Sequence, residues 1–403
     1  MTHDRATARD LSDRAAPVRS LSRREVLRLG ALGFAGVASL EFVAGCSRKS
    51  AGPAQDTGPL LPFQPDTSPG KSTGLPHRVA GAPTADSAFF LALGSGMKEA
   101  AAARGVDYVT ATSGNDPGKH ANQMTEFLTR GVGSLAMQPL NADADTPVLR
   151  KAIDMGVCAQ GIITAPSTMQ VVASQYQIGY DQGKAAADYA ATHLGGNAQV
   201  LYFNLDTVGP ALKVRHQGVL EGLKTGGGGI SVVGDVTVAD ISTTSGANTM
   251  LSALEAHPDI KIVLGGDTIV VGAYQALKVA GKLTDDMFLS GVDGDSGALQ
   301  LVKQGGAYKL SIAFAWKLMG YGLGQFGADW IAGKQVPRVL VARGVKLDSA
   351  AAVTSFDAAS ADAASVFADR AAYEKYLPLY GNVSHATRSR YWSTAIDPPS
   401  GSA

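Results

Sequence analysis

Short apolar runs alternate with longer segments of helical periodicity from His77 to Gln304. The apolar runs have the length of single strands: 79–82, 106–111, 133–137, 157–162, 199–203, 231–236, 261–264 and 288–292. The intervening segments have the length of helices: 88–104, 118–130, 144–155, 181–194, 210–224, 245–256, 268–281 and 295–304. Such regular alternation predicts right-handed crossovers and parallel sheets. Because this stretch is longer than a single hydrophobic core usually accommodates, the sequence predicts an α/β protein with two domains.

The charge balance narrows the functional classes. The 403 residues include 35 basic and 35 acidic side chains, so the formal net charge is zero. Nucleic-acid binding requires a surplus of Lys and Arg, and we therefore expect no nucleic-acid partner. With 17% charged and 45% hydrophobic residues, the composition excludes a disordered, charge-dominated chain.

The N-terminus has the layout of an export signal. Seven arginines precede the apolar run Leu29–Gly45, which is short for a membrane-spanning helix and contains Glu41. Ser22-Arg23-Arg24-Glu25-Val26-Leu27 resembles the twin-arginine export motif, and Val43-Ala44-Gly45-Cys46 resembles a bacterial lipobox, in which the cysteine is acylated. We therefore expect residues 1–45 to be a lipoprotein signal peptide and Cys46 to be the lipidation site. The alternative is an uncleaved anchor helix.

A Pro- and Gly-rich stretch follows the signal. Residues 46–76 contain six prolines and no apolar period, which predicts a flexible tether between the membrane and the folded part.

In parallel sheets, ligands bind beyond the carboxyl ends of the strands. This rule selects the loops 83–88, 138–142, 163–167, 204–209, 265–268 and 293–296. At such an edge, aromatic faces can pack against the C–H surfaces of a ligand, and carboxylates or amides can bind its hydroxyls. Phe89 and Phe90 supply rings at the first loop, and Asp267 and Asp293 end strands in the second domain.

An ordered set of motifs over residues 77–348 resembles the ribose-binding-protein family of type I periplasmic binding proteins. The matching landmarks are Ser87-Ala-Phe-Phe90, Asn115-Asp-Pro-Gly-Lys119, Arg130-Gly-Val, Gln138-Pro139, Ile178-Gly-Tyr-Asp181, Gly183-Lys184, Ala256-His-Pro-Asp-Ile260, Gly266-Asp267 and Gly291-Val-Asp-Gly294. The family captures sugars and related solutes for ABC importers. The resemblance implies two Rossmann-like lobes joined by a three-strand hinge, with crossings near Tyr180–Asp181, Phe314–Ala315 and Leu340–Arg343.

The same resemblance implies the lobes' extents. We expect an N-terminal lobe of residues 77–180 and 315–340, a C-terminal lobe of residues 181–314 and 341–380, and a tail of residues 381–403. Residues 349–379 are Ala-rich with helical periodicity, and we expect a helix packed on the second lobe.

Carried over by position, the resemblance implies a set of ligand-binding residues: Ser87, Phe89, Phe90, Gln138, Lys213, Asp267, Asp293 and Phe314. This chain has Ile163-Thr164 where ribose-type proteins place an Asp-Arg pair. The departure favours a polyol, a modified sugar or another small polar molecule over a simple pyranose.

Several of these residues also have a structural interpretation. One of the two phenylalanines can belong to the core of the first helix, and the two aspartates can cap the helices that follow them. Lys213 fits a solvated helix surface, and Cys158 fits a buried, inert thiol.

Motifs for catalysis are weak. Gly294-Asp-Ser-Gly297 resembles a protease nucleophile loop, but Ser296 opens a predicted helix. Gly322-Leu-Gly-Gln-Phe-Gly327 matches a dinucleotide-binding pattern but falls in a segment that the resemblance implies is helical, where small residues allow close packing. The seven histidines and two cysteines have no metal-ligand spacing. We therefore expect neither an enzyme, nor a cofactor, nor a metal site.

The sequence thus predicts a monomeric, extracytoplasmic lipoprotein anchored to the cell membrane. Its expected partners are a small solute, such as a sugar or polyol, and the permease of an ABC importer. The alternative function is a ligand sensor that docks on a receptor kinase or chemoreceptor.

Overall fold

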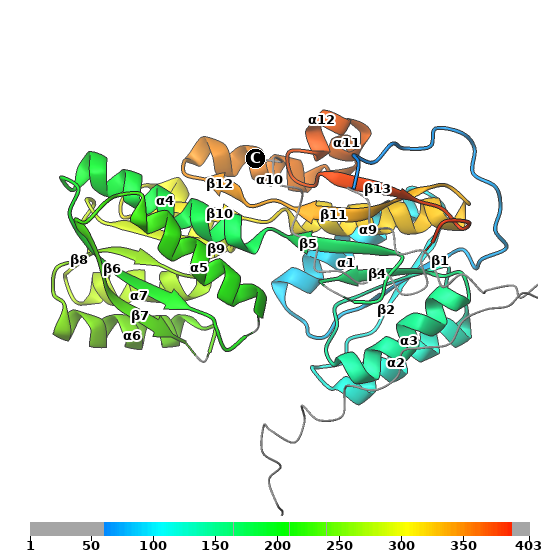
Figure 1. The fold of residues 1–403 in the computed structure, drawn as a ribbon, viewed down its shortest axis with the longest axis horizontal. Coiled ribbons are helices and arrows are strands. Elements are labelled where there is room, and N and C mark those ends of the chain that lie inside the picture. The colour runs from blue at the N-terminus through cyan, green and yellow to red at the C-terminus, as the bar shows by residue number, and fades with distance from the viewer. Residues whose placement is uncertain (1–59, 164, 209, 239, 389–403) are drawn as a thin grey trace, which may run out of the picture. The chain divides into compact units, whose positions relative to one another are not determined.

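The computed structural model describes residues 60–163, 165–208, 210–238 and 240–388. The predicted signal peptide, Cys46 and the first part of the predicted tether lie outside these residues. Within them, the chain forms two sheets, each with helices on both faces (Figure 1). The prediction of two α/β lobes is confirmed. No helix of the described residues is long and apolar enough to span a bilayer.

The first lobe contains a seven-stranded sheet in the order β13-β11-β5-β4-β3-β1-β2. Its strands are β1 (Arg78–Ala82), β2 (Asp107–Thr110), β3 (Ser134–Met137), β4 (Cys158–Ile162), β5 (Met169–Ala173), β11 (Val336–Ala342) and β13 (Leu379–Val383). Its helices are α1 (Ala88–Ala102), α2 (Pro117–Arg130), α3 (Ala142–Asp154) and α9 (Trp316–Ile331). Only β13 runs antiparallel to its neighbour, β11, in this sheet.

Alternating strand residues place these helices on opposite faces. Val79 of β1 belongs to the same buried cluster as Leu93 of α1, and α9 packs closely on α1. The next residue, Ala80, joins Met124 of α2 and Leu149 of α3 on the other face. Successive side chains of a strand point to opposite faces of the sheet, and both faces are buried here because helices cover each of them.

The second lobe contains a six-stranded sheet in the order β12-β10-β9-β8-β6-β7. Its strands are β6 (Ala198–Asn204), β7 (Ile230–Thr237), β8 (Ile260–Leu264), β9 (Phe288–Asp293), β10 (Tyr308–Ala313) and β12 (Val345–Leu347). Helices α4 (Gln175–His193) and α5 (Pro210–Lys224) cover one face. Helices α6 (Thr243–Ala256), α7 (Asp267–Val279) and α8 (Ser296–Gln304) cover the other.

The chain passes between the lobes where a strand of one sheet is followed by an element of the other. Two passages, between β10 and α9 and between β11 and β12, lie at the predicted crossings. The first passage differs from the prediction, because α4 begins at Gln175, directly after β5. Tyr180 and Asp181 therefore lie inside a helix of the second lobe, which packs along α5.

Glycines bring pairs of helices into close contact. A Cβ atom at Gly320 of α9 would lie 2.1 Å from the backbone oxygen of Leu93 in α1. At Gly324, within the dinucleotide-like pattern, it would lie 2.6 Å from the backbone oxygen of Met97. This pattern therefore serves helix packing, as the sequence analysis favoured.

The two ends of the described chain pack on the first lobe. Phe63 is 3% exposed, and its ring centroid lies 5.7 Å from that of Phe326 in α9. Its backbone N–H donates to the oxygen of Leu379, 2.8 Å away. Residues 60–63 of the predicted tether therefore pack on the first lobe, because the ring of Phe63 is buried there. No local periodicity in the sequence indicates this contact.

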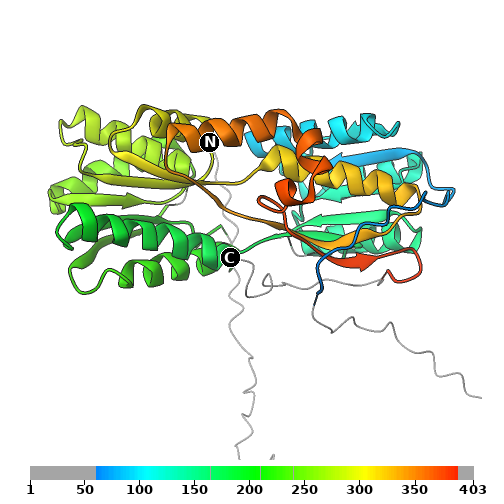
Figure 2. The ribbon, with the colours of Figure 1, turned by 90° about the horizontal axis from the view of Figure 1, so that it is seen from above.

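The C-terminal segment also differs from the expected single helix and tail. It forms α10 (Ala350–Ala361), α11 (Ala363–Ala368), α12 (Arg370–Tyr373) and β13. Helix α10 contacts both α8 and α9, and α11 packs on α9 (Figure 2). Residues 379–383, expected at the boundary of the second lobe and the tail, add a strand to the first sheet.

Candidate functional site

An aromatic cluster lies at the carboxyl edge of the first sheet. Phe89 and Phe90 begin α1, and the ring centroid of Phe89 lies 4.8 Å from that of Phe90 and 4.3 Å from that of Trp316. Phe314, in the passage between the lobes, lies 6.2 Å from Trp316. All four side chains are half-buried, so neither Phe89 nor Phe90 is only a core residue. The indole Nε1–H of Trp316 has no hydrogen-bond partner among the described residues.

Ser87 and Gln138 lie at the same edge of the sheet, before α1 and after β3. Ser87 is exposed and caps α1, with its hydroxyl accepting a hydrogen bond from the N–H of Phe90 at 3.5 Å. Gln138 is half-buried directly after β3. A recess beside them has an apolar lining that includes Pro83, Phe90 and Met137. The first lobe thus offers rings and aliphatic surface with few polar groups.

The loop after β4 departs from ordinary backbone geometry. Ile163 has a φ of 73°, a conformation that β-branched residues rarely adopt, and its side chain is 51% exposed. Thr164 lies outside the described residues. An exposed apolar residue therefore stands where the resemblance implies a charged pair in ribose-type proteins.

In the second lobe, Asp267 is fully buried and has a structural role. One carboxylate oxygen accepts from the hydroxyl of Tyr308 at 2.7 Å. The other accepts from the Ser311 hydroxyl at 2.7 Å and from the N–H groups of Gly294 and Asp295 at 2.7 and 3.0 Å. Burial raises the pKa of Asp267 to about 6, against the opposing effect of these hydrogen bonds. These protein donors occupy the carboxylate that the sequence analysis assigned to the ligand.

Asp293 ends β9 in a different environment. Its side chain is 32% exposed, its backbone φ is 121°, and Nη1 of Arg215 lies 4.0 Å from its carboxylate. Burial raises the pKa of Asp293 to about 7, while Arg215 opposes the shift and the nearby carboxylates of Asp267 and Asp295 add to it. A carboxylate that is accessible, partly desolvated and near a guanidinium is suited to accept hydrogen bonds from ligand hydroxyls.

No sequence motif points to Arg215, which lies beside Asp293. Its guanidinium is nearly buried, its Nε–H donates to Gln175 at 2.8 Å, and it lines a recess with Gly266 beneath the carboxyl edge of the sheet. Lys213, which was predicted to bind ligand, is exposed instead. Helical periodicity could have indicated the position of Arg215. Arg215 lies on the buried side of α5 with Leu212 and Val219, whereas Lys213 lies off that side.

The motifs for other chemistry do not assemble in the described residues. Ser296 is the exposed first residue of α8. The described part of the chain holds no group of three His, Cys, Asp or Glu side chains arranged for a metal ion. Cys158 is fully buried, and burial raises its pKa to about 12, so the thiol is inert.

Known proteins resemble the chain over the two lobes. The ribose import binding protein of Bacillus subtilis is 26% identical over 275 residues, which cover 64% of this chain and 83% of that protein. A putative rhizopine-binding protein of Rhizobium meliloti is 28% identical over 253 residues, covering 60% and 80%.

Solved structures share the fold. An ABC transporter solute-binding protein from Bacillus halodurans with bound myo-inositol superimposes with a TM-score of 0.59 and 19% identity, covering 73% of this chain and 99% of that chain. The model of the periplasmic binding protein domain matches residues 81–335. Because that match spans more than half of the sequence, the chain belongs to the family of periplasmic binding protein domains.

Proposed function

We propose that this chain is a solute-binding protein, not an enzyme, that holds a sugar, a cyclic polyol or a similar small polar molecule between its lobes. The observation that carries this proposal is the chemical difference between the carboxyl edges of the two sheets, one in each lobe. The first presents the rings of Phe89, Phe90 and Trp316, and the second presents the carboxylate of Asp293 beside Arg215. The names of the ribose-binding and rhizopine-binding relatives agree with this ligand class.

The two edges suit the two chemical faces of such a ligand. Aromatic rings pack against the C–H face of a sugar ring. Asp293 accepts hydrogen bonds from hydroxyls. A ligand that contacts both lobes stabilises the closed state by the contacts that only this state allows.

A thermal-shift panel tests the ligand class. The full chain is melted with D-ribose, D-allose, D-apiose, myo-inositol and a set of nucleosides. A true ligand at about 100 times its Kd stabilises the folded state by about 2.7 kcal/mol and raises the melting temperature. If none of the sugars or polyols shifts the melt, this ligand class is wrong.

A carboxylate variant then tests the site. Asp293→Asn should raise the Kd of the bound sugar roughly ten- to hundredfold, as expected for one hydrogen bond to a charged group. The matched control is Asp259→Asn, the same change at an exposed residue before β8, at the opposite edge of this sheet. Equal affinities for the two variants would remove Asp293 from the site.

For localisation, we propose an extracytoplasmic lipoprotein that is anchored through Cys46, with residues 1–45 as its signal peptide, and that delivers its solute as a monomer to an ABC importer. Residues 1–59 lie outside the described residues, so the proposal rests on the sequence motifs. Cys46→Ser should release the protein from membranes, whereas Cys158→Ser, the control at the other cysteine, should not. Unchanged membrane retention of Cys46→Ser would indicate an uncleaved anchor helix.

A further inference from the structure

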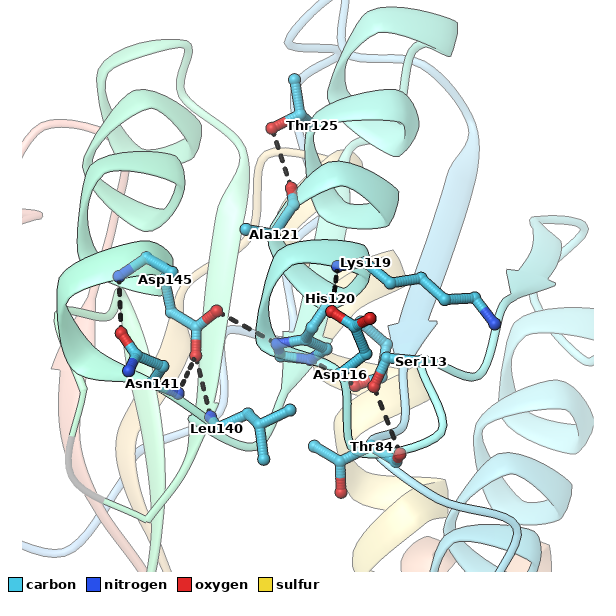
Figure 3. Close-up of polar contacts among 12 residues, drawn as sticks. Thr84, Ser113, Asp116, Lys119, His120, Ala121, Thr125, Leu140, Asn141 and Asp145 are labelled. Carbon is cyan, nitrogen blue, oxygen red and sulfur yellow. Dashed lines mark hydrogen bonds and ion pairs between the residues drawn. The ribbon is translucent and has the colours of Figure 1, made fainter. Parts of the chain in front are cut away.

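Two ionisable side chains form a buried pair in the first lobe, away from the groups assigned to the ligand. His120 of α2 is 0% exposed, and Asp145 of α3 is 1% exposed. The ring Nδ1 of His120 lies 3.0 Å from one carboxylate oxygen of Asp145, and its Nε2 lies 3.2 Å from the backbone oxygen of Ala82. Figure 3 shows the ring of His120 facing the carboxylate of Asp145.

The other oxygen of Asp145 extends the network to a second loop. It accepts from the backbone N–H groups of Leu140 and Asn141 at 2.8 and 3.0 Å (Figure 3). Ala82 ends β1 and leads into the loop 83–87, which carries Ser87 and precedes Phe89 in α1. Leu140 and Asn141 belong to the loop that begins with Gln138. The pair therefore connects the loop that carries Ser87 and leads into α1 to the loop that begins with Gln138, two residues predicted to bind the ligand.

The partners of His120 restrict its protonation. The carbonyl oxygen of Ala82 has no proton to donate, so Nε2 must carry the hydrogen. An ionised Asp145, which already accepts two backbone N–H groups, requires a hydrogen on Nδ1 as well. All four hydrogen bonds form together when one proton is shared between Nδ1 and the facing carboxylate oxygen and a second hydrogen sits on Nε2.

We propose that His120 and Asp145 are positioning residues that fix the loops 83–87 and 138–141 and thereby set the affinity for the solute. This inference rests on the proposed function for its ligand. Its geometry is independent of the ligand, because the four hydrogen bonds are internal to the first lobe. Both side chains are buried, so we expect them to act through the loops and not by direct contact with the solute.

Two variants of Asp145 separate positioning from general stability. Asp145→Ala removes the acceptor of both backbone N–H groups and the partner of Nδ1. Asp145→Asn can keep every contact, because its amide oxygen accepts from Leu140 and Asn141 while its NH₂ group donates to Nδ1 of a neutral ring. The control is Gln160→Leu, which removes a buried hydrogen bond to the Leu323 oxygen in the same lobe without touching either loop.

Three measurements are made on the full chain. Amide hydrogen exchange at Leu140 and Asn141 and ¹⁵N spectra of the His120 ring are recorded without ligand. The Kd is measured with the panel sugar or polyol that binds the wild-type protein. We expect a hydrogen on Nε2 of His120 in both the wild-type protein and Asp145→Asn, and none on Nδ1 in Asp145→Asn. Exchange at the two amides should accelerate about tenfold or more in Asp145→Ala, because their buried hydrogen bonds are lost.

The affinities decide the positioning role. We expect Asp145→Ala to raise the Kd about tenfold or more, and Asp145→Asn and Gln160→Leu to stay within about threefold of the wild-type value. A Kd for Asp145→Ala as low as that of Gln160→Leu would overturn the proposal. If Asp145→Ala does not fold, the test rests on Asp145→Asn. A doubly protonated His120 ring in that variant, or a Kd ten times that of the wild-type protein, would then overturn the proposal. If no panel molecule binds the wild-type protein, the ligand class fails, while exchange and ring spectra still report whether the pair holds the loops.

Discussion

Backbone strain in the described residues gathers at the carboxyl ends of strands. The non-glycine residues with positive φ there are Asn115, Ile163 and Asp293, in the loops after β2 and β4 and at the end of β9. Such conformations cost about 1–3 kcal/mol each and persist where surrounding contacts enforce them. At Asp293, the hydrogen bonds from Gly294 and Asp295 to the buried Asp267 supply that constraint. The strained turn leaves the Asp293 carboxylate partly exposed beside Arg215.

The raised pKa of Asp293 predicts a pH dependence of stability. In the folded protein this pKa is about 7 because of burial, whereas an unfolded aspartate has a pKa of about 3.9. Between these values the folded state binds more protons, so the contribution of Asp293 to the free energy of unfolding falls as pH rises from about 4 to about 7. Urea unfolding of the ligand-free protein should therefore show Asp293→Asn gaining stability relative to the wild-type protein across this window. A constant difference between the two proteins would contradict the shift.

The sequence identified both aspartates but could not distinguish their roles. Each follows a parallel strand and precedes a helix, so the local pattern is the same. Asp267 is structural because Tyr308 and Ser311, more than 40 residues away, donate to it. The prediction of Lys213 rests on position matching alone, which takes no account of the side of α5 that is buried, where Arg215 lies. Roles set by distant partners are not encoded in a local motif.

At the scale of elements, strands and helices with a clear period were predicted well. The strand β5 was missed, since its five residues follow β4 after a short loop and have no period of their own. The periodicity predicts a helix from residue 181, and the resemblance implies a crossing near Tyr180–Asp181. Helix α4 begins at Gln175, and Gly179 and Gly183 pack against the backbone of α5. Glycines in a helix of this kind mark contact with another helix rather than a break in the helix.

The contact between α1 and α9 supplies a test at this scale. Gly320→Ala would place a methyl group 2.1 Å from the backbone oxygen of Leu93 and force the two helices apart. We expect a loss of about 1–3 kcal/mol in the free energy of unfolding, as for overpacked cores. The control is Gly297→Ala in α8, where no atom lies within 4 Å, and where Ala should stabilise the helix by about 0.5–1 kcal/mol. Denaturant unfolding that gives the same sign for both variants would contradict the close contact.

At the scale of the whole molecule, the lobes follow from the alternation of strands and helices, but their boundaries do not. The C-terminal segment returns to the first lobe through β13, and α10 contacts both lobes on the way. An ion pair between Lys303 of α8 and Asp357 of α10, 2.7 Å apart, fastens it to the second lobe. These contacts join residues far apart in sequence, and the matched domain model ends at residue 335. Neither periodicity nor resemblance could therefore place this segment.

The docking of Phe63 decides where the proposed tether ends. Its partner ring, Phe326, is more than 260 residues away, and Gln64 is joined to Asn382 of β13 by hydrogen bonds at 2.7 and 3.0 Å. Phe63→Ala should lower the free energy of unfolding by about 3–5 kcal/mol, as for other buried phenylalanines. Leu61→Ala, two residues away but 71% exposed, should change it by less than about 0.5 kcal/mol. If thermal and urea unfolding find the two variants alike, residues 60–63 belong to a free tether and the folded part begins nearer His77.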